Sequence, residues 1–324
     1  MRLEQIETFP ELKDGKCREM QAFDDHIVRT ALWPATTPTP RGTICLLQGR
    51  AEYIEKYYEV VSELRAKGFA VATFDWRGQG GSDRLLENPR KGHIGRFSDY
   101  GRDLEQFLHE QVLPDCPRPF FALAHSMGAL ILLNQLPRLR TIFDRAALSA
   151  PLVQLATDRR KILGKRVSQI TIRRLTGLAR LLMMGQKFAL GVDKRSVTGS
   201  WSFDTNPLTS DGPRYDRNRL FLEAYPEKGI AGPTFQWVHE ACKAMSNLQS
   251  SDFQSAVHTP TLMMPVGFDQ IVSSKATAIL AQTMRCGHAI TIAGSRHEIL
   301  MEKNIYREQF WAAFDAFIPG SKDD

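Results

Sequence analysis

Residues 120–136 read FFALAHSMGALILLNQL and contain the most informative local pattern in the sequence. The first of these residues have the composition of a buried strand and run into the small-residue turn AHSMG, residues 124–128, after which an apolar helical pattern begins. A sharp strand-to-helix turn strains the backbone at the serine, and the residues two before and two after must be small because neighbouring backbone lies against them. The pattern therefore predicts a nucleophile elbow with Ser126 as nucleophile. An ordinary strand, turn and helix around a buried serine is the alternative.

Short apolar runs alternate with helical patterns along most of the chain. The predicted strands are Thr43–Leu47, Ala70–Phe74, Phe120–Ala124, Ala146–Ser149, Thr261–Val266 and Ala289–Ile292. Apolar residues at helical spacing predict helices over residues 57–67 and 100–112, and Gly68 is typical of a residue that ends a helix. The alternation implies a mostly parallel sheet flanked by helices. Together with the elbow, it predicts an α/β protein with the α/β-hydrolase fold.

The alternation breaks in the second half of the chain. Residues 153–252 hold helical patterns mixed with Gly, Pro, Asn and Asp, and no clear strand. We therefore expect a hydrolase core over residues 1–152, an inserted and mainly helical cap over 153–252, and the second part of the core over 253–324. A separate domain is the alternative, but the last strands follow the insertion and need the first half of the chain to complete the sheet.

An acid and a histidine follow the elbow in the order that this fold requires. Asp269 comes just after the run Thr261–Val266, and His297 lies in a small-residue loop after the last predicted strand. Both therefore fall at the sheet edge where the elbow lies. Asp252 is the alternative acid, but it precedes the strand and lies at the cap boundary. The sequence predicts that His297 is the general base for Ser126 and that Asp269 orients it.

Two backbone amides are candidates for stabilising an oxyanion. The helix that begins after Ser126 directs its positive end at the site, so the Met127 amide can donate to it. The loop after strand Thr43–Leu47 supplies the second donor in this fold, and there Gly49 permits a tight turn before the Arg50 amide. The Arg50 side chain is expected either to meet an anionic head group or to point into solvent.

A second loop, DWRGQGGS over residues 75–82, is dense in glycine. It lacks the Lys-Ser/Thr ending of a P-loop, and its glycines do not fit GxGxxG. The sequence predicts a structural turn beneath the site.

Composition narrows the class of protein. The 324 residues carry a net charge of +6 and are 43% hydrophobic, which is typical of a globular protein. The first residues lack the apolar run of a secretory signal, and no stretch reaches about 18 uncharged apolar residues, so we expect a cytoplasmic protein without a membrane-spanning helix, for which any membrane contact would be peripheral. Five scattered cysteines without a CxxC pair argue against a zinc site or a disulfide framework. No metal or organic cofactor is expected.

Basic residues gather in the predicted cap, where Asp193 alone opposes them and leucine, isoleucine and methionine lie between them. They are Arg159, Arg160, Lys161, Lys165, Arg166, Arg173, Arg174, Arg180, Lys187, Lys194 and Arg195. A basic amphipathic stretch suits an anionic membrane surface, or an acyl chain with a phosphate at its rim. The alternative is a cap helix with its apolar face on the core and a solvated basic face. Nucleic acid is disfavoured because no stacking motif accompanies the charge.

The chain resembles the monoacylglycerol lipase and bacterial lysophospholipase family of serine hydrolases over nearly its whole length. The resemblance is carried by GRAE at 49–52, DWRGQG at 75–80, AHSMG at 124–128 and SRHEILMEK at 295–303, the last especially similar to the lysophospholipase branch. Family members usually carry His where this chain has Gln48, and often His or Tyr where it has Trp76; neither difference removes a backbone donor.

The resemblance implies cleavage of the ester of a single-acyl-chain lipid through an acyl-enzyme. The implied triad is Ser126, Asp269 and His297, with Arg50 and Met127 as amide donors. A general carboxylesterase, a peptidase or an acyltransferase of the same fold is an alternative. A catalytically silent lipid-binding protein is an alternative of another class, and the ordered triad argues against it.

Overall fold

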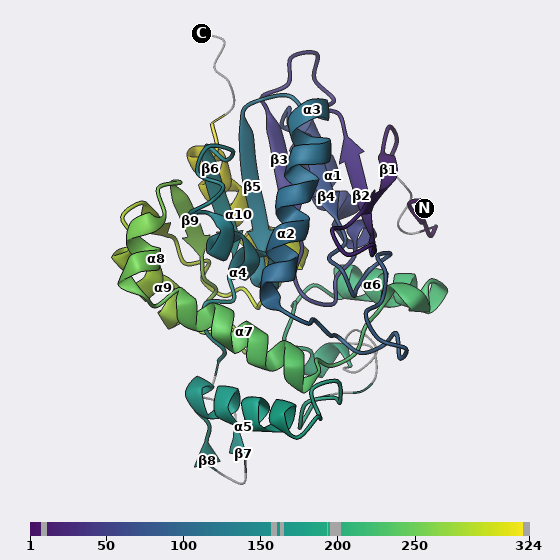
Figure 1. The fold of residues 1–324 in the computed structure, drawn as a ribbon. Helices are drawn as coiled ribbons and strands as arrows, with labels where there is room; N and C mark the ends of the chain where they lie inside the picture. The colour runs from purple at the N-terminus through teal and green to yellow at the C-terminus, as the bar shows by residue number, and fades with distance from the viewer. Residues whose placement is uncertain (8–11, 157–160, 163–164, 193, 195–201, 320–324) are drawn as a thin grey trace.

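The computed structural model describes residues 1–7, 12–156, 161–162, 165–192, 194 and 202–319 (Figure 1). Its centre is an eight-stranded sheet in the order β1-β2-β4-β3-β5-β6-β9-β10. The strands are β1 Lys16–Gln21, β2 Ile27–Trp33, β3 Thr43–Leu47, β4 Ala70–Phe74, β5 Phe120–His125, β6 Arg145–Ser149, β9 Thr261–Met264 and β10 Gly287–Ala289. Only the pairings of β2 with β1 and with β4 are antiparallel. The predicted mostly parallel sheet is therefore confirmed.

The central strands are apolar throughout because both of their faces are covered. Every residue of β3, β4 and β5 is buried, which explains why their sequences lack the alternation of a half-exposed strand. The last strand, β10, ends at Ala289, where the sequence predicted a strand to begin. Beyond it only an isolated bridge from Ile292 to Val266 continues the pairing.

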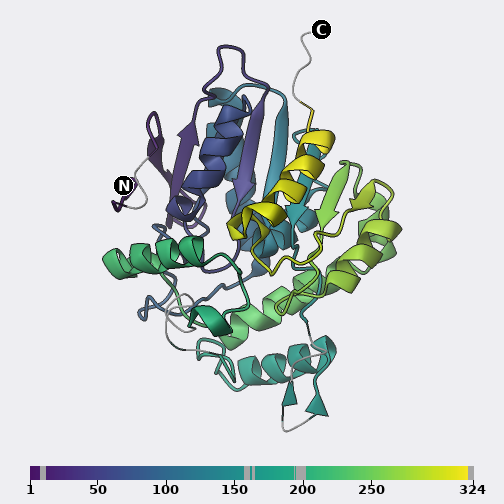
Figure 2. The same ribbon diagram turned by 180° about the vertical axis from the view of Figure 1, so that it is seen from behind.

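Helices cover both faces of the sheet (Figures 1 and 2). One face carries α2 Phe97–Phe107, α4 Ser126–Gln135 and α9 Ser274–Thr283, and the other carries α1 Tyr58–Ala66 and α10 Asn304–Phe317. The predicted helix over 57–67 forms as a short 3₁₀ turn, η1 Ile54–Tyr57, followed by α1, and Gly68 ends it with a φ of +91°. The second predicted helix begins three residues early, as α2, and continues through a π-helix, η2 Leu108–Val112, and the short α3 Leu113–Asp115.

The amino-terminal strands β1 and β2 were not predicted. Strand β2 reads IVRTALW, and the Arg29 at its centre interrupts the apolar run. Arg29 is nevertheless completely buried, because its guanidinium pairs with Glu55 and Asp75, each at 2.6 Å. These partners follow β2 in the sequence, so only the folded chain shows why an arginine is stable there.

The insertion, which we define as the chain between β6 and β9, adds no described strand to the main sheet. It contains α5 Gln169–Leu181, α6 Gly212–Ala224, α7 Phe235–Asn247 and α8 Ser251–Ala256, with the 3₁₀ turns η4 Phe203–Thr205 and η5 Pro226–Lys228. A small antiparallel pair, β7 Lys161–Ile162 with β8 Lys165–Arg166, was not predicted. The described part of the insertion consists of these helices, the short strand pair and connecting loops; the division into core and cap at residues 153 and 252 stays a prediction.

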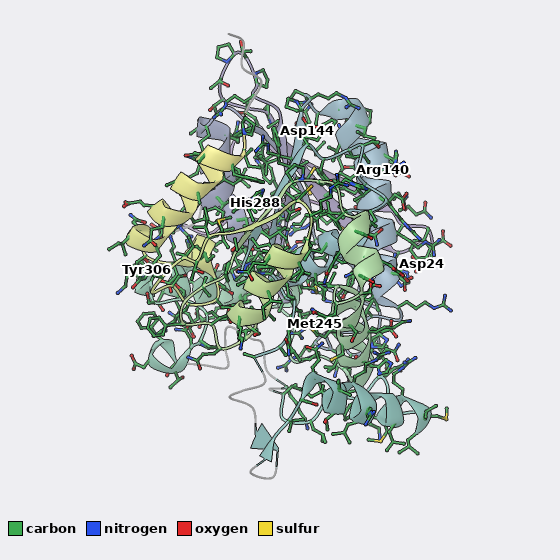
Figure 3. The ribbon with its side chains drawn as sticks, turned by 90° about the vertical axis from the view of Figure 1, so that its left-hand side faces the viewer. Asp24, Arg140, Asp144, Met245, His288 and Tyr306 are labelled. Carbon is green, nitrogen blue, oxygen red and sulfur yellow. The ribbon has the colours of Figure 1, made fainter. Side chains whose placement is uncertain are left out.

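Helix α7 lies between the sheet and α5, as Figure 3 shows with Met245 of α7 labelled. The side of α5 that is buried is made of small residues, Thr176 and Ala179. Its leucines are exposed instead, so the alternative of a cap helix with its apolar face on the core does not describe α5. Among the described residues, no helix is long and apolar enough to cross a membrane.

Candidate active site

Ser126 occupies the turn between β5 and α4. Its φ of +48° lies in the left-handed region, which residues with a side chain rarely adopt. A Cβ atom at Gly128 would overlap the carbonyl oxygens of Leu47 and Gln48, so only glycine fits there. The small residue predicted two positions after the serine is therefore required by close backbone contacts.

Three distant segments of the chain meet at this turn. Ser126 Oγ lies 3.0 Å from His297 Nε2, and His297 Nδ1 lies 2.8 Å from Asp269 Oδ2. The other oxygen of Asp269 accepts the N–H groups of Ile271 and Val272 at 2.8 and 2.9 Å. The carboxylate is thus fixed by two backbone donors while it holds the imidazole. The side chains of His297 and Asp269 are only 5% and 1% exposed, so water competes little for these bonds.

Burial and the ion pair with Asp269 shift the pKa of His297 in opposite directions. Burial alone would lower the pKa of His297, but the charge and hydrogen bond of Asp269 outweigh it and raise the pKa above its usual value. Burial would likewise raise the pKa of Asp269, yet His297 and the two backbone N–H groups lower it. The aspartate therefore stays ionised, and the imidazolium that forms when His297 accepts a proton is stabilised.

The alternative residues lie elsewhere. Asp252 is exposed on α8. His125 Nδ1 lies 3.1 Å from the Ser149 carbonyl oxygen, and burial lowers the pKa of His125 to about 4, which keeps it neutral. His258 is exposed and His239 Nδ1 contacts the Arg173 carbonyl oxygen. None of these groups hydrogen-bonds Ser126 Oγ.

The loop after β3 lies against the elbow. A Cβ at Gly49 would contact the His125 ring at 2.9 Å, so this glycine permits a close approach that a larger residue would prevent. The Gly49 N–H donates to the Glu52 carboxylate. Ala51 has a φ of +63°, which makes the loop a tight turn. The predicted donor, the Arg50 amide, lies within this turn; the other, the Met127 amide, lies in the first turn of α4, where N–H groups have no intrahelical acceptor.

The Arg50 side chain points neither into open solvent nor to a carboxylate within the described chain. Its guanidinium donates to the Ala231 carbonyl of the insertion and lies 5.4 Å from the Trp237 ring centroid. Its Nε is buried without a hydrogen-bond partner. Burial lowers the pKa of Arg50 to about 10, so the group remains a cation at neutral pH.

A buried ion-pair cluster beside the triad was missed by sequence reasoning. Lys56 Nζ lies 2.7 Å from both Glu52 Oε1 and Glu298 Oε1, and the Tyr57 hydroxyl donates to Glu52 at 2.8 Å. The cluster links the loop after β3 to the residue that follows His297. The only sequence signal was the presence of Glu52 and Glu298 in the motifs GRAE and GSRHE. Within the described residues, no group of three or more His, Cys, Asp or Glu side chains is arranged to hold a metal ion.

A serine, histidine and aspartate joined by hydrogen bonds at the carboxyl edge of a mostly parallel sheet define a serine hydrolase of the α/β-hydrolase fold. Over residues 38–304 the chain matches the family described as serine aminopeptidase, S33, and it belongs to that family.

Individual relatives agree with this class. The chain is 31% identical over 299 residues to lysophospholipase L2 of Escherichia coli K12, covering 89% of this chain and 83% of that protein. It is 26% identical to the probable lysophospholipase L2 of Haemophilus influenzae, covering 86% and 84%. The crystal structure of a soluble variant of monoglyceride lipase from Saccharomyces cerevisiae has the same fold, with a TM-score of 0.72, 20% identity and 94% coverage of both chains. The predicted resemblance is confirmed, and the chain is an ester hydrolase.

Proposed function

We propose that this enzyme hydrolyses the carboxylic ester of a single-acyl-chain lipid, a lysophospholipid or a monoacylglycerol, with Ser126 as nucleophile. The observation that carries the proposal is the continuous hydrogen-bond chain from Ser126 through His297 to Asp269, at 3.0 and 2.8 Å. The lysophospholipases among the relatives support a lipid ester as the substrate.

The first half of the reaction forms an acyl-enzyme. Ser126 Oγ attacks the ester carbonyl while His297 Nε2 accepts its proton, and Asp269 stabilises the resulting imidazolium. The carbonyl oxygen becomes an oxyanion that the Met127 and Arg50 amides stabilise. Loss of one such donor in other serine hydrolases costs about 2.7–4 kcal/mol of transition-state stabilisation. His297 then returns the proton to the departing glycerol oxygen.

The second half releases the fatty acid. A water molecule takes the place of the alcohol, His297 removes its proton, and the hydroxide attacks the acyl carbonyl. The same two amides stabilise the second oxyanion. Collapse of this intermediate breaks the bond to Ser126 Oγ, which recovers its proton from His297.

A phosphate-bearing head group is favoured over an uncharged one. Arg50 extends from the proposed oxyanion loop as a half-buried cation, with its Nε buried and without a carboxylate partner in the described chain, and such a charge is stabilised when a counter-ion binds. A lysophospholipid brings a phosphate a few bonds from the reacting carbonyl, whereas a monoacylglycerol brings none. The lysophospholipid is therefore the first substrate to test.

The test measures fatty acid released from lysophosphatidylcholine and, separately, from a monoacylglycerol. Release that disappears in the Ser126→Ala variant supports the proposal, and release from the glyceride alone would assign the uncharged substrate. Absence of release from both lipids, while a fluorophosphonate still labels Ser126, would contradict the substrate class and favour a general carboxylesterase, a peptidase or an acyltransferase. Absence of labelling as well would favour the silent lipid-binding protein.

Contact with an anionic membrane through α5 is the second part of the proposal, and it places the enzyme at the cytoplasmic face of a membrane. The exposed fractions are 54% for Leu178 and 83% for Leu181 of α5, and 93% for Met183 just after the end of this helix. Arg173 and Arg174 are exposed on the same helix. Transfer of each such apolar side chain from water to lipid contributes about 1.5–3 kcal/mol, and each nearby basic residue about 1 kcal/mol at an anionic surface. Of the basic run, Arg159, Arg160 and Arg195 lie outside the described residues.

Sedimentation with vesicles tests this contact. The double variant Leu181→Asp with Met183→Asp should lose binding to vesicles that contain phosphatidylglycerol. Ile305→Asp is the matched control, because Ile305 is 63% exposed but lies on α10 and not on α5. Equal binding by both variants would contradict the proposed role of α5.

A further inference from the structure

The side chain of Gln79, in the glycine-dense loop 75–82, forms hydrogen bonds with the loop after β3. Its Nε2 donates to the Gly49 carbonyl at 2.8 Å and to the Glu52 carbonyl at 3.1 Å. Its Oε1 accepts the Ala51 N–H at 3.1 Å. The residue is 2% exposed, so these bonds face little competition from water. One side chain thus holds three backbone groups of a four-residue turn.

The bond to Gly49 determines where the proposed oxyanion donor points. The Gly49 carbonyl and the Arg50 N–H belong to the same peptide unit, and in a planar trans peptide these groups point in opposite directions. Because Gln79 binds the carbonyl, the Arg50 N–H is directed away from Gln79. That N–H donates to no acceptor in the described chain, so it is available to a substrate oxygen.

The preceding peptide, Gln48–Gly49, is hydrogen-bonded through both its carbonyl and its N–H group. The Trp76 indole donates to the Gln48 carbonyl at 2.9 Å, and the Gly49 N–H donates to Glu52. Free rotation about Gly49 would otherwise be easy, because glycine lacks a Cβ. A rotated Gly49–Arg50 peptide would direct its carbonyl oxygen, instead of the N–H, at the developing oxyanion.

We propose that Gln79 is a positioning residue that builds the oxyanion hole by fixing the orientation of the Gly49–Arg50 peptide. The inference rests on the proposed serine-hydrolase mechanism, and it gives the glycine-dense loop a part in the reaction. The loop itself is anchored independently of Gln79. Asp75 accepts the Gly81 N–H at 2.6 Å and pairs with Arg29, and the Ser82 hydroxyl donates to the Asp75 carbonyl at 2.6 Å.

Two substitutions at Gln79 separate positioning from support of the fold. Gln79→Met keeps the length of the side chain and removes its hydrogen bonds. Gln79→Glu keeps an acceptor for the Ala51 N–H but brings a negative charge against the Gly49 and Glu52 carbonyls, which favours rotation of the peptide. Ser82→Ala is the matched control, since Ser82 is buried in the same loop and bonds Arg29 N and the Asp75 carbonyl but nothing in the oxyanion loop.

The rates are measured on p-nitrophenyl butyrate, together with the affinity for an alkyl trifluoromethyl ketone, whose adduct with the serine carries an oxyanion. For Gln79→Met we expect kcat to fall between about 10-fold and about 10³-fold, up to the loss of a whole donor, with KM within about twofold. The affinity of Gln79→Met for the ketone should fall in parallel with kcat, and kcat of Gln79→Glu should be at least as low. The midpoint of the acid limb of the pH–rate profile should stay unchanged in Gln79→Met. Ser82→Ala should keep kcat and ketone affinity while its unfolding midpoint falls.

A Gln79→Met enzyme with wild-type kcat would overturn the inference. So would a slow variant that binds the ketone as tightly as the wild type. Failure of the proposed lipid substrate is a separate result, because the small ester reports on the oxyanion hole even when neither lipid is hydrolysed.

Discussion

Replacement of Asp269 by Asn should prevent His297 from acting as a general base without moving its ring. In Asp269→Asn, the Ile271 and Val272 N–H groups, now 2.8 and 2.9 Å from Oδ1, require an acceptor and therefore retain the amide oxygen. The amide NH₂ must then face His297 Nδ1, which lies 2.8 Å from the present Oδ2. Two donors cannot face each other, so Nδ1 becomes the acceptor and the proton moves to Nε2. The histidine then presents an N–H to Ser126 Oγ and cannot act as its base.

The magnitude follows from this change of tautomer. An Asp-to-Asn change with the same effect in a chymotrypsin-type triad lowers kcat about 10⁴-fold, and at 1.36 kcal/mol per factor of ten this corresponds to about 5.4 kcal/mol of lost transition-state stabilisation. The assay is kcat/KM for p-nitrophenyl butyrate as a function of pH, with Asp252→Asn as the control. The control should match the wild type because Asp252 is exposed on α8. A loss smaller than about tenfold in Asp269→Asn, or an equal loss in the control, would refute the assignment of the acid.

Three further outcomes follow from the same contacts. In the wild type, the acid limb of kcat/KM should have its midpoint above about pH 6.5, because Asp269 raises the pKa of His297 and the base works only when neutral. In Asp269→Asn any residual activity should titrate at lower pH, because burial lowers the pKa of His297 and the opposing carboxylate charge is gone. A midpoint that does not move would contradict this prediction. Lys56→Met should leave the buried carboxylates of Glu52 and Glu298 without their cationic partner and lower the free energy of unfolding in urea by about 3–5 kcal/mol. Lys67→Met, whose partner Asp315 is 43% exposed, should cost about 0–1 kcal/mol, and similar costs for the two variants would show that the buried ion pairs stabilise the fold no more than an exposed one. Gly128→Ala should abolish hydrolysis, because the added methyl overlaps the carbonyl oxygens of Leu47 and Gln48 and displaces the loop after β3. Turnover at the wild-type rate in this variant would contradict the prediction, since it would mean that this loop can shift without loss of activity.

The parts of the fold that could be predicted are those in which the hydrophobic pattern of the local sequence matches the burial of the residues in the folded chain. Strands β3 and β4 begin and end where predicted, because they are buried on both faces and must be apolar along their whole length. The proximity of Ser126, Asp269 and His297, the proposed triad, could be predicted because the chain order and the strand ends restrict each residue to one sheet edge.

The parts that escaped prediction depend on contacts between distant residues. Arg29 made β2 look unlike a strand, since its partners Asp75 and Glu55 are 46 and 26 positions away. Lys56 and Glu298 are 242 positions apart, and nothing local indicates that they pair. The loop over residues 75–82 was predicted to be a structural turn, but the bond from Gln79 to the Gly49 carbonyl could not be predicted, because it spans 30 positions and leaves no periodic pattern in the sequence.

The most direct test of the central claim is to trap the acyl-enzyme. The enzyme is mixed with palmitoyl-lysophosphatidylcholine, stopped with acid during turnover and digested, and the peptides are examined by mass spectrometry. We expect a palmitoyl group on the peptide that contains Ser126, and none in Ser126→Ala. A palmitoyl group on another residue, or fatty acid release at the wild-type rate from Ser126→Ala, would contradict the account.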